Sequence, residues 1–220
     1  MNMNSDILII TLDGNIGAGK STFLKELEKE LPYIDIVLEP VDVWESLVSE
    51  DGKSLLVKFY EDPKRWGYTF QNCAILTRIL EVKKKIKTTT KKVIVTERSV
   101  LTDLNVFAKI NRDLGNINKL EWDLYMKWAD GYAVDVPVDA AIHITTSVDT
   151  SIKRIENRAR NGEQQIPRDY LEKLHEYHHL WLDNTDLPVL NISTETNESI
   201  KSNVHKVDNF IKSMMSMSKQ

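Results

Sequence analysis

The residues best suited to chemistry lie near the N-terminus, where Gly14 to Ser21 matches the phosphate-binding pattern G-x-x-x-x-G-K-[ST]. Glycines let the backbone turn so that N–H groups point at phosphate oxygens. Lys20 adds a positive charge that reaches the β- and γ-phosphates, and the Ser21 hydroxyl can ligate Mg²⁺. We expect ATP to contact the residues of this loop: Gly14, Asn15, Ile16, Gly17, Ala18, Gly19, Lys20, Ser21 and Thr22.

The segments beside the loop have the character that the pattern requires. Ile7–Ile10 is a short apolar run, typical of a buried parallel strand, and an amphipathic helix begins near Phe23. Short apolar runs then alternate with helical patterns along the chain, which predicts an α/β fold with a parallel sheet. The further expected strands are Ile34–Leu38, Val93–Val95, Ala140–Ile144 and Val189–Ile192.

Two of the expected helices lie on either side of the strand Val93–Val95 in the sequence. Asp62-Pro63 is typical of an N-cap followed by the first helical residue, and it predicts a long helix that reaches about Lys85. A second helix is expected from about Val100 to Ile110. The pattern is that of repeated β–α units.

Charged residues follow two of the expected strands. Glu39 stands before Pro40, which ends its strand, and Glu97 and Arg98 follow Val95 closely. Ligands of open α/β sheets bind at the carboxyl ends of the strands. Such residues can also be solvated loop residues, but their coincidence with a phosphate loop favours a functional role for Glu39, Glu97 and Arg98.

A basic cluster occurs later, on an expected helix that starts near Val148. Arg154 and Arg158 are four residues apart, so they share one helix face. Phosphoryl transfer needs cations that meet the charge on the transferred group, carried by a segment able to close over it. The arginines could instead form a solvated basic helix face. Because the chain also contains a phosphate loop, we favour a lid at about residues 154–165.

Two other patterns point to different chemistry. His175 to His179 satisfies H-E-x-x-H, the helical zinc-protease pattern, but no third metal ligand is evident. Asn118 to Glu121 resembles the guanine-reading N-K-x-D but lacks its aspartate. We therefore expect neither a zinc hydrolase nor a GTP-dependent switch.

Length and composition bound the class of protein. With 220 residues, the chain suits a single domain over residues 1–220. The net charge of −4 argues against bulk binding to nucleic acid or to an anionic membrane. Cys73 is the only cysteine, and neither a targeting segment nor an apolar run of roughly 20 residues is evident. A cytoplasmic protein is expected.

At this point the chain resembles one family, the deoxynucleoside kinases of the deoxycytidine, deoxyguanosine and insect multisubstrate type. The resemblance implies a P-loop kinase with a five-stranded parallel sheet flanked by helices, an arginine-bearing lid and usually a homodimer. The segments that carry it are Gly14–Thr22, Glu39–Trp44, Tyr60–Trp66, Phe70-Gln71, Glu97–Ser99, Arg154–Arg160 and Tyr170–Glu176.

The resemblance also implies roles for the charged residues. Glu39 is the base that takes the proton of the sugar 5′-hydroxyl, and Arg98 hydrogen-bonds that hydroxyl and keeps Glu39 ionised. Glu97 joins Ser21 around Mg²⁺, although the base role is also assigned at this position in the family. The cations of the lid, which meet the phosphates of ATP with Lys20, are Arg154 and Arg158.

For the nucleoside, the resemblance implies that Tyr60 and Glu163 hold the 3′-hydroxyl. Gln71 can read a base edge because its amide both donates and accepts. Phe107 stacks on the base. The remaining expected lining is apolar: Ile16, Trp44, Leu56 and Phe70.

Three positions bear on which base is bound. In the family, an Arg–Asp pair such as Arg78 with Asp103 accompanies cytosine and purine substrates, and apolar residues there accompany thymidine. Such a pair can accept from an exocyclic amine and donate to a carbonyl, and Ala74 leaves space for a larger ring. We expect deoxyadenosine, deoxyguanosine or deoxycytidine to be preferred over thymidine.

The expected activity is transfer of the ATP γ-phosphoryl group to the 5′-hydroxyl of a deoxynucleoside, which gives the 5′-monophosphate and depends on Mg²⁺. Two alternatives stay open: a nucleoside-monophosphate kinase of the thymidylate kinase type, and a non-catalytic nucleotide-binding regulator. The order among the three bases, the preference for ATP over other donors, and feedback by deoxynucleoside triphosphates are also open.

Overall fold

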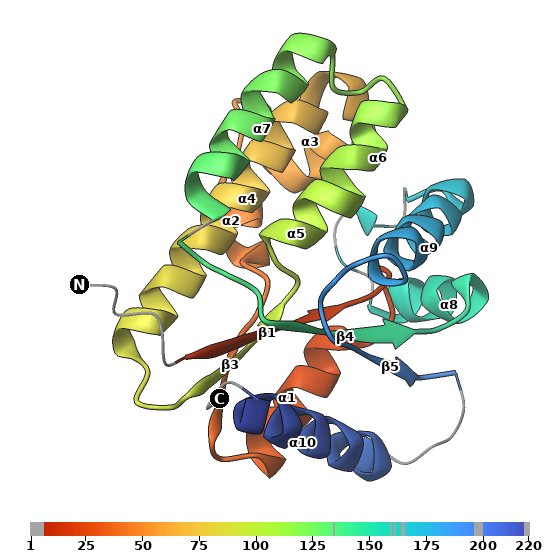
Figure 1. Ribbon diagram of the computed structural model, residues 1–220. Coiled ribbons are helices and arrows are strands. Elements are labelled where there is room, and N and C mark those ends of the chain that lie inside the picture. Colours follow the sequence, from red (N-terminus) through yellow and green to blue (C-terminus); the bar gives the residue numbers. More distant parts are fainter. Residues whose placement is uncertain are drawn as a thin grey trace.

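The computed structural model describes residues 7–217, except 134, 159, 161, 164–165 and 196–199. A sheet of five parallel strands runs through the molecule in the order β2-β3-β1-β4-β5 (Figure 1). The strands are β1 (Leu8–Asp13), β2 (Ile34–Val37), β3 (Val93–Glu97), β4 (Ala140–Thr145) and β5 (Val189–Ser193). The predicted α/β fold with a five-stranded parallel sheet is confirmed.

Helices fill the connections between the strands. They are α1 (Lys20–Glu30), α2 (Val41–Ser46), α3 (Leu55–Glu61), α4 (Pro63–Thr88), α5 (Val100–Thr102), α6 (Ala108–Asp113), α7 (Lys119–Ala133), α8 (Val148–Arg158), α9 (Arg168–Leu182) and α10 (Ile200–Met217). Between α5 and α6 lies a π-helical turn, η1 (Asp103–Phe107).

The long helix predicted after Asp62 is present. The Asp62 side chain accepts a hydrogen bond from the backbone N–H of Arg65, so it caps the helix as expected. The single helix predicted from Val100 to Ile110 is instead interrupted by the wider π-helical turn. The sequence carried no sign of that interruption.

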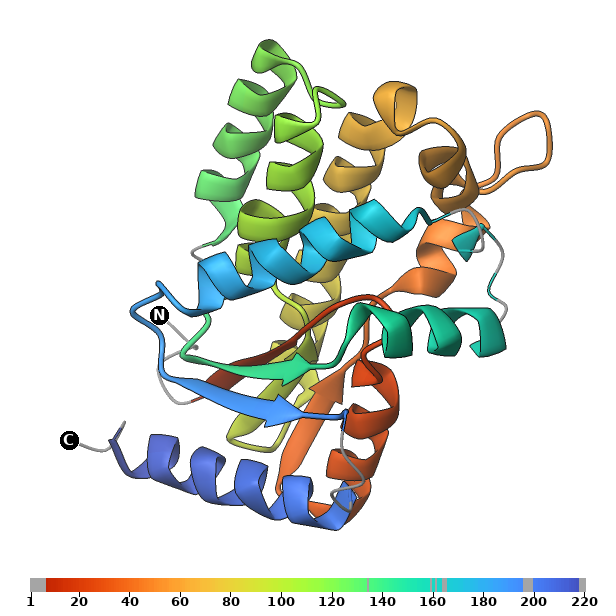
Figure 2. The ribbon, with the colours of Figure 1, turned by 90° about the vertical axis from the view of Figure 1, so that its right-hand side faces the viewer.

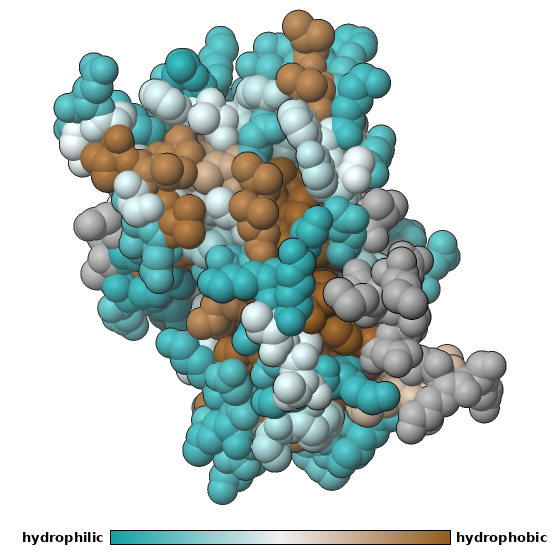
Figure 3. All heavy atoms as spheres, turned by 90° about the vertical axis from the view of Figure 1, so that its left-hand side faces the viewer, coloured by the Kyte–Doolittle hydropathy of each residue, from teal (hydrophilic) through white to brown (hydrophobic). Residues whose placement is uncertain are grey.

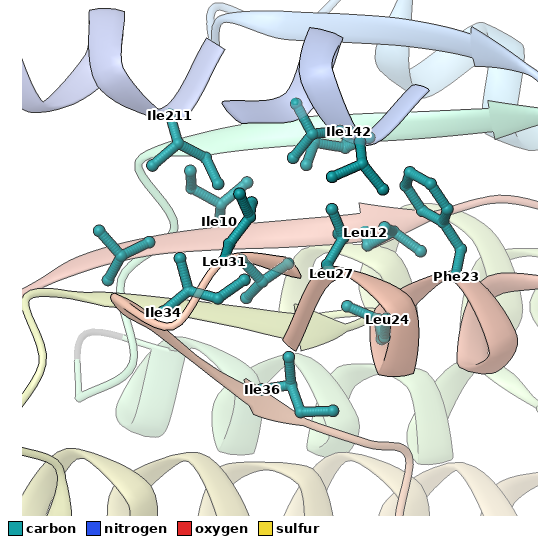
Figure 4. Close-up of a cluster of buried hydrophobic side chains, with 14 of the residues drawn as sticks. Ile10, Leu12, Phe23, Leu24, Leu27, Leu31, Ile34, Ile36, Ile142 and Ile211 are labelled. Atoms are coloured by element: carbon teal, nitrogen blue, oxygen red, sulfur yellow. The ribbon is translucent and has the colours of Figure 1, made fainter. Parts of the chain in front are cut away.

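The sheet is covered on both faces. Helices α1 and α10 lie on one face, and α4, α7 and α9 lie on the other (Figures 1 and 2). Side chains alternate along β1, so Ile10 and Leu12 point to the first face and Ile9 to the second. Figure 4 shows Ile10 and Leu12 packed with Leu27 of α1 and Ile211 of α10.

The phosphate loop begins where β1 ends. Gly14 has a φ of 146°, and a Cβ there would lie 2.3 Å from the Ile144 carbonyl oxygen. Only glycine therefore fits where the loop passes the end of β4. Gly19, with a φ of 93°, directly precedes α1. The loop is thus fixed between the sheet edge and the N-terminus of a helix, which favours anions.

One face of the molecule exposes large apolar side chains. Figure 3 shows hydrophobic residues gathered on the side that carries α4 and α7. The exposed apolar residues of these two helices are Leu76, Leu80, Leu120, Leu124, Trp128 and Tyr132. The rings of Trp128 and Tyr132 stack, with centroids 5.7 Å apart. We refer to these six residues as the apolar face.

None of the described helices combines the length and the apolar character needed to span a membrane.

Candidate active site

A cavity of about 340 Å³ opens at the carboxyl edge of the sheet, next to the phosphate loop. Its size lies within the usual range for small-molecule sites. The structure brings together on its wall all the residues predicted to bind a nucleoside: Glu39, Trp44, Leu56, Tyr60, Phe70, Gln71, Ala74, Arg78, Arg98, Asp103, Phe107 and Glu163. Ile16, Lys20, Ser21, Glu97 and Arg158 also line it.

Inside the phosphate loop, the buried Lys20 donates a hydrogen bond to the Asn15 carbonyl oxygen at 2.8 Å. The Asn15 side chain accepts from the Ile16 backbone N–H and donates to the Leu171 carbonyl of α9. Burial, and then the charge of Arg98, lower the pKa of Lys20 to about 7. The loop is therefore braced by its own side chains and by α9, with its cation turned inward.

At the centre of the site, the Glu39 carboxylate meets two guanidinium groups. One Arg98 nitrogen donates to both Glu39 oxygens, at 2.7 and 2.6 Å, and Arg78 donates to Oε1 at 3.0 Å. Burial raises the pKa of Glu39, but the charges of Arg98, Arg78 and Lys20 outweigh it and lower the pKa to about 2. Glu39 is consequently an ionised acceptor that faces the cavity.

Arg98 itself has an unusual backbone. Its φ of 61° is the only positive value among the described residues other than glycine. The left-handed region costs roughly 1–2 kcal/mol for a residue with a side chain. Its guanidinium lies 4.6 Å from the centroid of the Phe107 ring and donates to the Gly14 carbonyl at 3.4 Å. This backbone turn lets Arg98 touch the carboxylate, the phosphate loop and an aromatic wall at once.

Ser21 and Glu97, the predicted metal ligands, lie together beside the loop. The Ser21 hydroxyl donates to Glu97, with oxygen–oxygen distances of 2.9 and 3.0 Å. Mg²⁺ prefers oxygen ligands and usually takes only one or two from protein, the others being water and phosphate oxygens. This pair fits such an ion. Within the described ranges, no group of three or more His, Cys, Asp or Glu side chains could hold a metal by itself.

At the inner end of the cavity, Arg78 is paired with Asp103. Its Nε donates to Oδ2 at 2.8 Å and a terminal nitrogen donates to Oδ1 at 3.2 Å. Another nitrogen donates to the Glu97 carbonyl at 2.8 Å. Arg78 therefore links the predicted base-reading residue Asp103 to Glu39 and to the end of β3.

Gln71 contrasts with this paired network. The residue is 1% exposed, yet neither its amide nitrogen nor its amide oxygen has a hydrogen-bond partner among the described groups. A buried amide without partners is costly. Because Gln71 lines the cavity, a ligand with both a donor and an acceptor on one edge supplies the missing partners.

The walls around Gln71 are aromatic. The rings of Phe59 and Phe70 stack with centroids 4.6 Å apart, and Trp44 meets Phe70 edge-on at 5.2 Å. Phe107 also lines the cavity, and its ring packs against the Arg98 guanidinium. A slot with aromatic walls and a polar end suits a flat heterocycle.

The two predicted lid arginines occupy different places. Arg158 lines the cavity and donates to both Glu163 oxygens, the shortest contact being 2.6 Å. Arg154 does not line it, and instead donates to the carbonyl oxygens of Ala18 and Thr194, at 3.1 Å each. Arg160 also reaches Glu163, at 3.2 Å. Within the predicted lid, residues 159, 161, 164 and 165 lie outside the described part of the chain.

Two tyrosines, Tyr60 and Tyr170, line the cavity together with Glu163. Burial, and then the charge of Glu163, raise the pKa of Tyr60, which keeps its hydroxyl neutral. Tyr170 was not predicted as a site residue, but it lines the cavity with its hydroxyl buried. Burial raises its pKa to about 12. Its sequence context matches that of a core aromatic on a helix, and the only signal was its place at the start of the family-like segment Tyr170–Glu176.

The histidines of the H-E-x-x-H pattern lie on α9. The rings of His175 and His179 are 4.7 Å apart, and His143 of β4 lies 4.9 Å from His179. His178 is buried, with its Nδ1 2.6 Å from the Leu174 carbonyl oxygen. These histidines pack against one another and against the sheet.

Comparison with known proteins agrees with this geometry. The chain is 33% identical to deoxycytidine kinase 1 of Xenopus laevis, over 92% of this chain and 87% of that protein. It is 32% identical to human deoxycytidine kinase, over 93% and 91%, and 31% identical to the mitochondrial deoxyguanosine kinase of Xenopus laevis, over 82% and 75%. The family model described as deoxynucleoside kinase matches residues 10–216. The chain therefore belongs to the deoxynucleoside kinase family.

Proposed function

We propose that this deoxynucleoside kinase transfers the γ-phosphoryl group of ATP to the 5′-hydroxyl of a deoxynucleoside, with Mg²⁺ as the metal. The observation that carries the proposal is the position of the Glu39–Arg98 pair. It lies between the phosphate loop on one side and a cavity with aromatic walls and an unpaired Gln71 on the other. A nucleoside with its base at Gln71 directs its 5′-carbon toward that pair.

Glu39 acts on the sugar hydroxyl. Its carboxylate accepts the hydroxyl proton as the oxygen–phosphorus bond forms and the γ-phosphoryl bond to ADP breaks. A carboxylate with a pKa of about 2 is a weak base, but a loose phosphoryl-transfer transition state needs little proton removal before bond formation. Arg98 keeps Glu39 ionised and fixes its orientation. Positioning of the sugar hydroxyl therefore supplies most of the rate enhancement.

The donor end is held by the phosphate loop. The backbone N–H groups of the loop and Lys20 meet the phosphates, and Ser21 with Glu97 are the residues that would hold Mg²⁺, which neutralises charge between the phosphates when bound. Of the two predicted lid cations, Arg158 lines the cavity and Arg154 does not. Because Arg158 contacts Glu163, the residue proposed to hold the 3′-hydroxyl, it can reach both the transferred group and the sugar.

The site also fits a deoxyribose. Tyr60 and Glu163 line the cavity together, where a sugar 3′-hydroxyl can pair with both. A tyrosine packed against the sugar leaves little room for a 2′-hydroxyl. Because a deoxynucleoside triphosphate carries both a nucleoside and a polyphosphate, we propose that end-product triphosphates compete for the same cavity and loop as feedback inhibitors.

Two alternative functions make different demands. A nucleoside-monophosphate kinase needs additional unpaired cations for the acceptor phosphate, whereas Arg78 and Arg98 are already paired with carboxylates. A non-catalytic regulator needs no ionised carboxylate beside the phosphate loop. We favour the deoxynucleoside kinase for these reasons, and, with only Cys73 as cysteine, we place it in the reducing cytoplasm.

The activity is tested with purified protein, ATP, Mg²⁺ and each deoxynucleoside or deoxynucleoside monophosphate. We expect 5′-monophosphates from deoxynucleosides and no turnover of monophosphates. Glu39→Gln should lower kcat by about 10²–10⁴-fold, with ATP binding retained, because the proton acceptor and its ion pair with Arg98 are lost together. The exposed Glu45→Gln on α2 is the matched control and should retain activity. The absence of any 5′-monophosphate from the wild-type protein contradicts the proposal.

The pH dependence tests the charge of Arg98. With a pKa of about 2, Glu39 stays ionised from pH 5 to 9, so it causes no loss of kcat/KM on the acid side in the wild type. In Arg98→Met, the largest of the charges that lower the pKa of Glu39 is lost while burial still raises it, so this pKa rises and kcat/KM at pH 5.5 relative to pH 8 should fall. Arg98→Lys keeps the positive charge, so its pH profile of kcat/KM should be parallel to that of the wild type. Both variants should have a low kcat. Parallel profiles for all three proteins contradict this role.

Base preference is tested with the four deoxynucleosides. Asp103 can accept from the exocyclic amine of cytosine or adenine and Arg78 can donate to a carbonyl, so at least one of deoxyadenosine, deoxyguanosine and deoxycytidine should exceed thymidine in kcat/KM by about tenfold or more. Ala74→Val fills the space beside this pair, so it should lower kcat/KM for the purine deoxynucleosides relative to kcat/KM for deoxycytidine. A thymidine preference in the wild type refutes the assignment.

We also propose that a second copy of the chain covers the apolar face, forming a homodimer through α4 and α7. Exposed apolar patches of this kind mark interfaces, and closed two-fold dimers are the commonest assemblies. Trp128→Glu, which places a charge on this face, should convert a dimer to a monomer in light scattering. Leu180→Glu, at an exposed leucine of α9, is the control. A monomeric wild-type protein contradicts the assembly.

A further inference from the structure

A buried hydrogen-bond network stands behind the catalytic residues, where β1 ends. Asp13, its last residue, is fully buried and was not assigned any role from the sequence. One of its carboxylate oxygens accepts from the Thr11 hydroxyl at 2.7 Å, and the other accepts from the Thr102 hydroxyl at 2.5 Å. Thr11 belongs to the same strand, whereas Thr102 belongs to α5.

The Thr102 hydroxyl has three polar neighbours: the Asp13 carboxylate, the Ser99 backbone N–H and, at 3.2 Å, the Ser99 hydroxyl. A hydroxyl carries one proton, and a carboxylate only accepts, so Thr102 gives its proton to Asp13. Its oxygen is then free to accept the backbone N–H of Ser99, at 2.9 Å. In return, the Thr102 backbone N–H donates to the Ser99 hydroxyl at 3.3 Å. Asp13 thus orients Thr102, and Thr102 fixes the peptide bond that joins Arg98 to Ser99.

That peptide bond sets the direction of Arg98. The left-handed backbone of Arg98 is strained and persists only where its neighbours hold it. On its N-terminal side, the Arg98 N–H donates to the Leu12 carbonyl at 3.1 Å. On its C-terminal side, the Ser99–Thr102 bonds hold the chain. Both sets of bonds lead to the end of β1: the first directly to Leu12, the second through Thr102 to Asp13.

We infer that Thr102, anchored on Asp13, is a positioning residue that holds the Arg98 turn so that its guanidinium meets Glu39. The inference deepens the proposed function, on which it rests. Neither side chain lines the cavity, and both act through the backbone of the turn. The expected signature is a loss of kcat with little change in the KM for ATP or nucleoside.

The matched pair of variants is Thr102→Val and Thr11→Val. Both are isosteric and both remove one buried hydroxyl donor from Asp13, but only the Thr102 hydroxyl continues to the turn. We expect Thr102→Val to lower kcat at least tenfold, with each KM within threefold of wild type. Thr11→Val should keep kcat within threefold while lowering the melting temperature to a similar degree. Thr102→Ser, which keeps the hydroxyl, should restore kcat.

Several results overturn the inference. It fails if Thr102→Val keeps the kcat of the wild type, or if Thr11→Val lowers kcat as much as Thr102→Val does. It also fails if Thr102→Ser has the low kcat expected of Thr102→Val. A loss confined to the nucleoside KM also overturns it, because the effect then passes through the adjoining Asp103. If Thr102→Val does not fold, Ser99→Ala weakens the same turn from its other side and should lower kcat at least threefold. Failure of the proposed function is distinct, since it appears as wild-type protein without turnover.

Discussion

The structure depends on one buried interaction, the contact between the Glu39 carboxylate and the Arg98 guanidinium. Isolated charges are expensive to bury, so each must be paired and hydrogen-bonded. Here the pairing extends inward: Arg78 joins Glu39 to Asp103, and the carbonyl of Glu97 accepts from Arg78 as well. The result is an ionised acceptor held in place before any ligand arrives, which is what a reaction that relies on positioning needs.

The order of the strands explains why these groups meet. Glu39 follows β2, Arg98 follows β3 and the phosphate loop follows β1, and the sheet places these strands side by side as β2-β3-β1. Arg98 is therefore central, with Glu39 on one side and the Gly14 carbonyl on the other. The chain visits the three positions in a different order, so their spatial order comes only from the topology of the sheet.

Much of this arrangement was predictable because it rests on local chemistry. The phosphate pattern, the apolar runs and the Asp62-Pro63 cap each depend on a few adjacent residues, and the structure contains the strands and helices they predicted. The divergence of Arg154 from Arg158 was not predictable. Their spacing of four residues gives a shared helix face, but the loop after β5 comes close enough to bind Arg154 through Thr194. Tyr170 was missed for the same reason, since only packing turns it toward the cavity.

The π-helical turn is the clearest feature that local sequence patterns could not predict. An α-helix was expected from Val100, and nothing in the sequence marks the extra residue that widens the turn at Asp103–Phe107. Turns of this kind concentrate at functional sites. This one carries Asp103, paired with Arg78, and Phe107, which lies under Arg98. One short segment thus joins the Arg78–Asp103 pair to the Glu39–Arg98 pair, so a substitution in this turn affects the geometry of both.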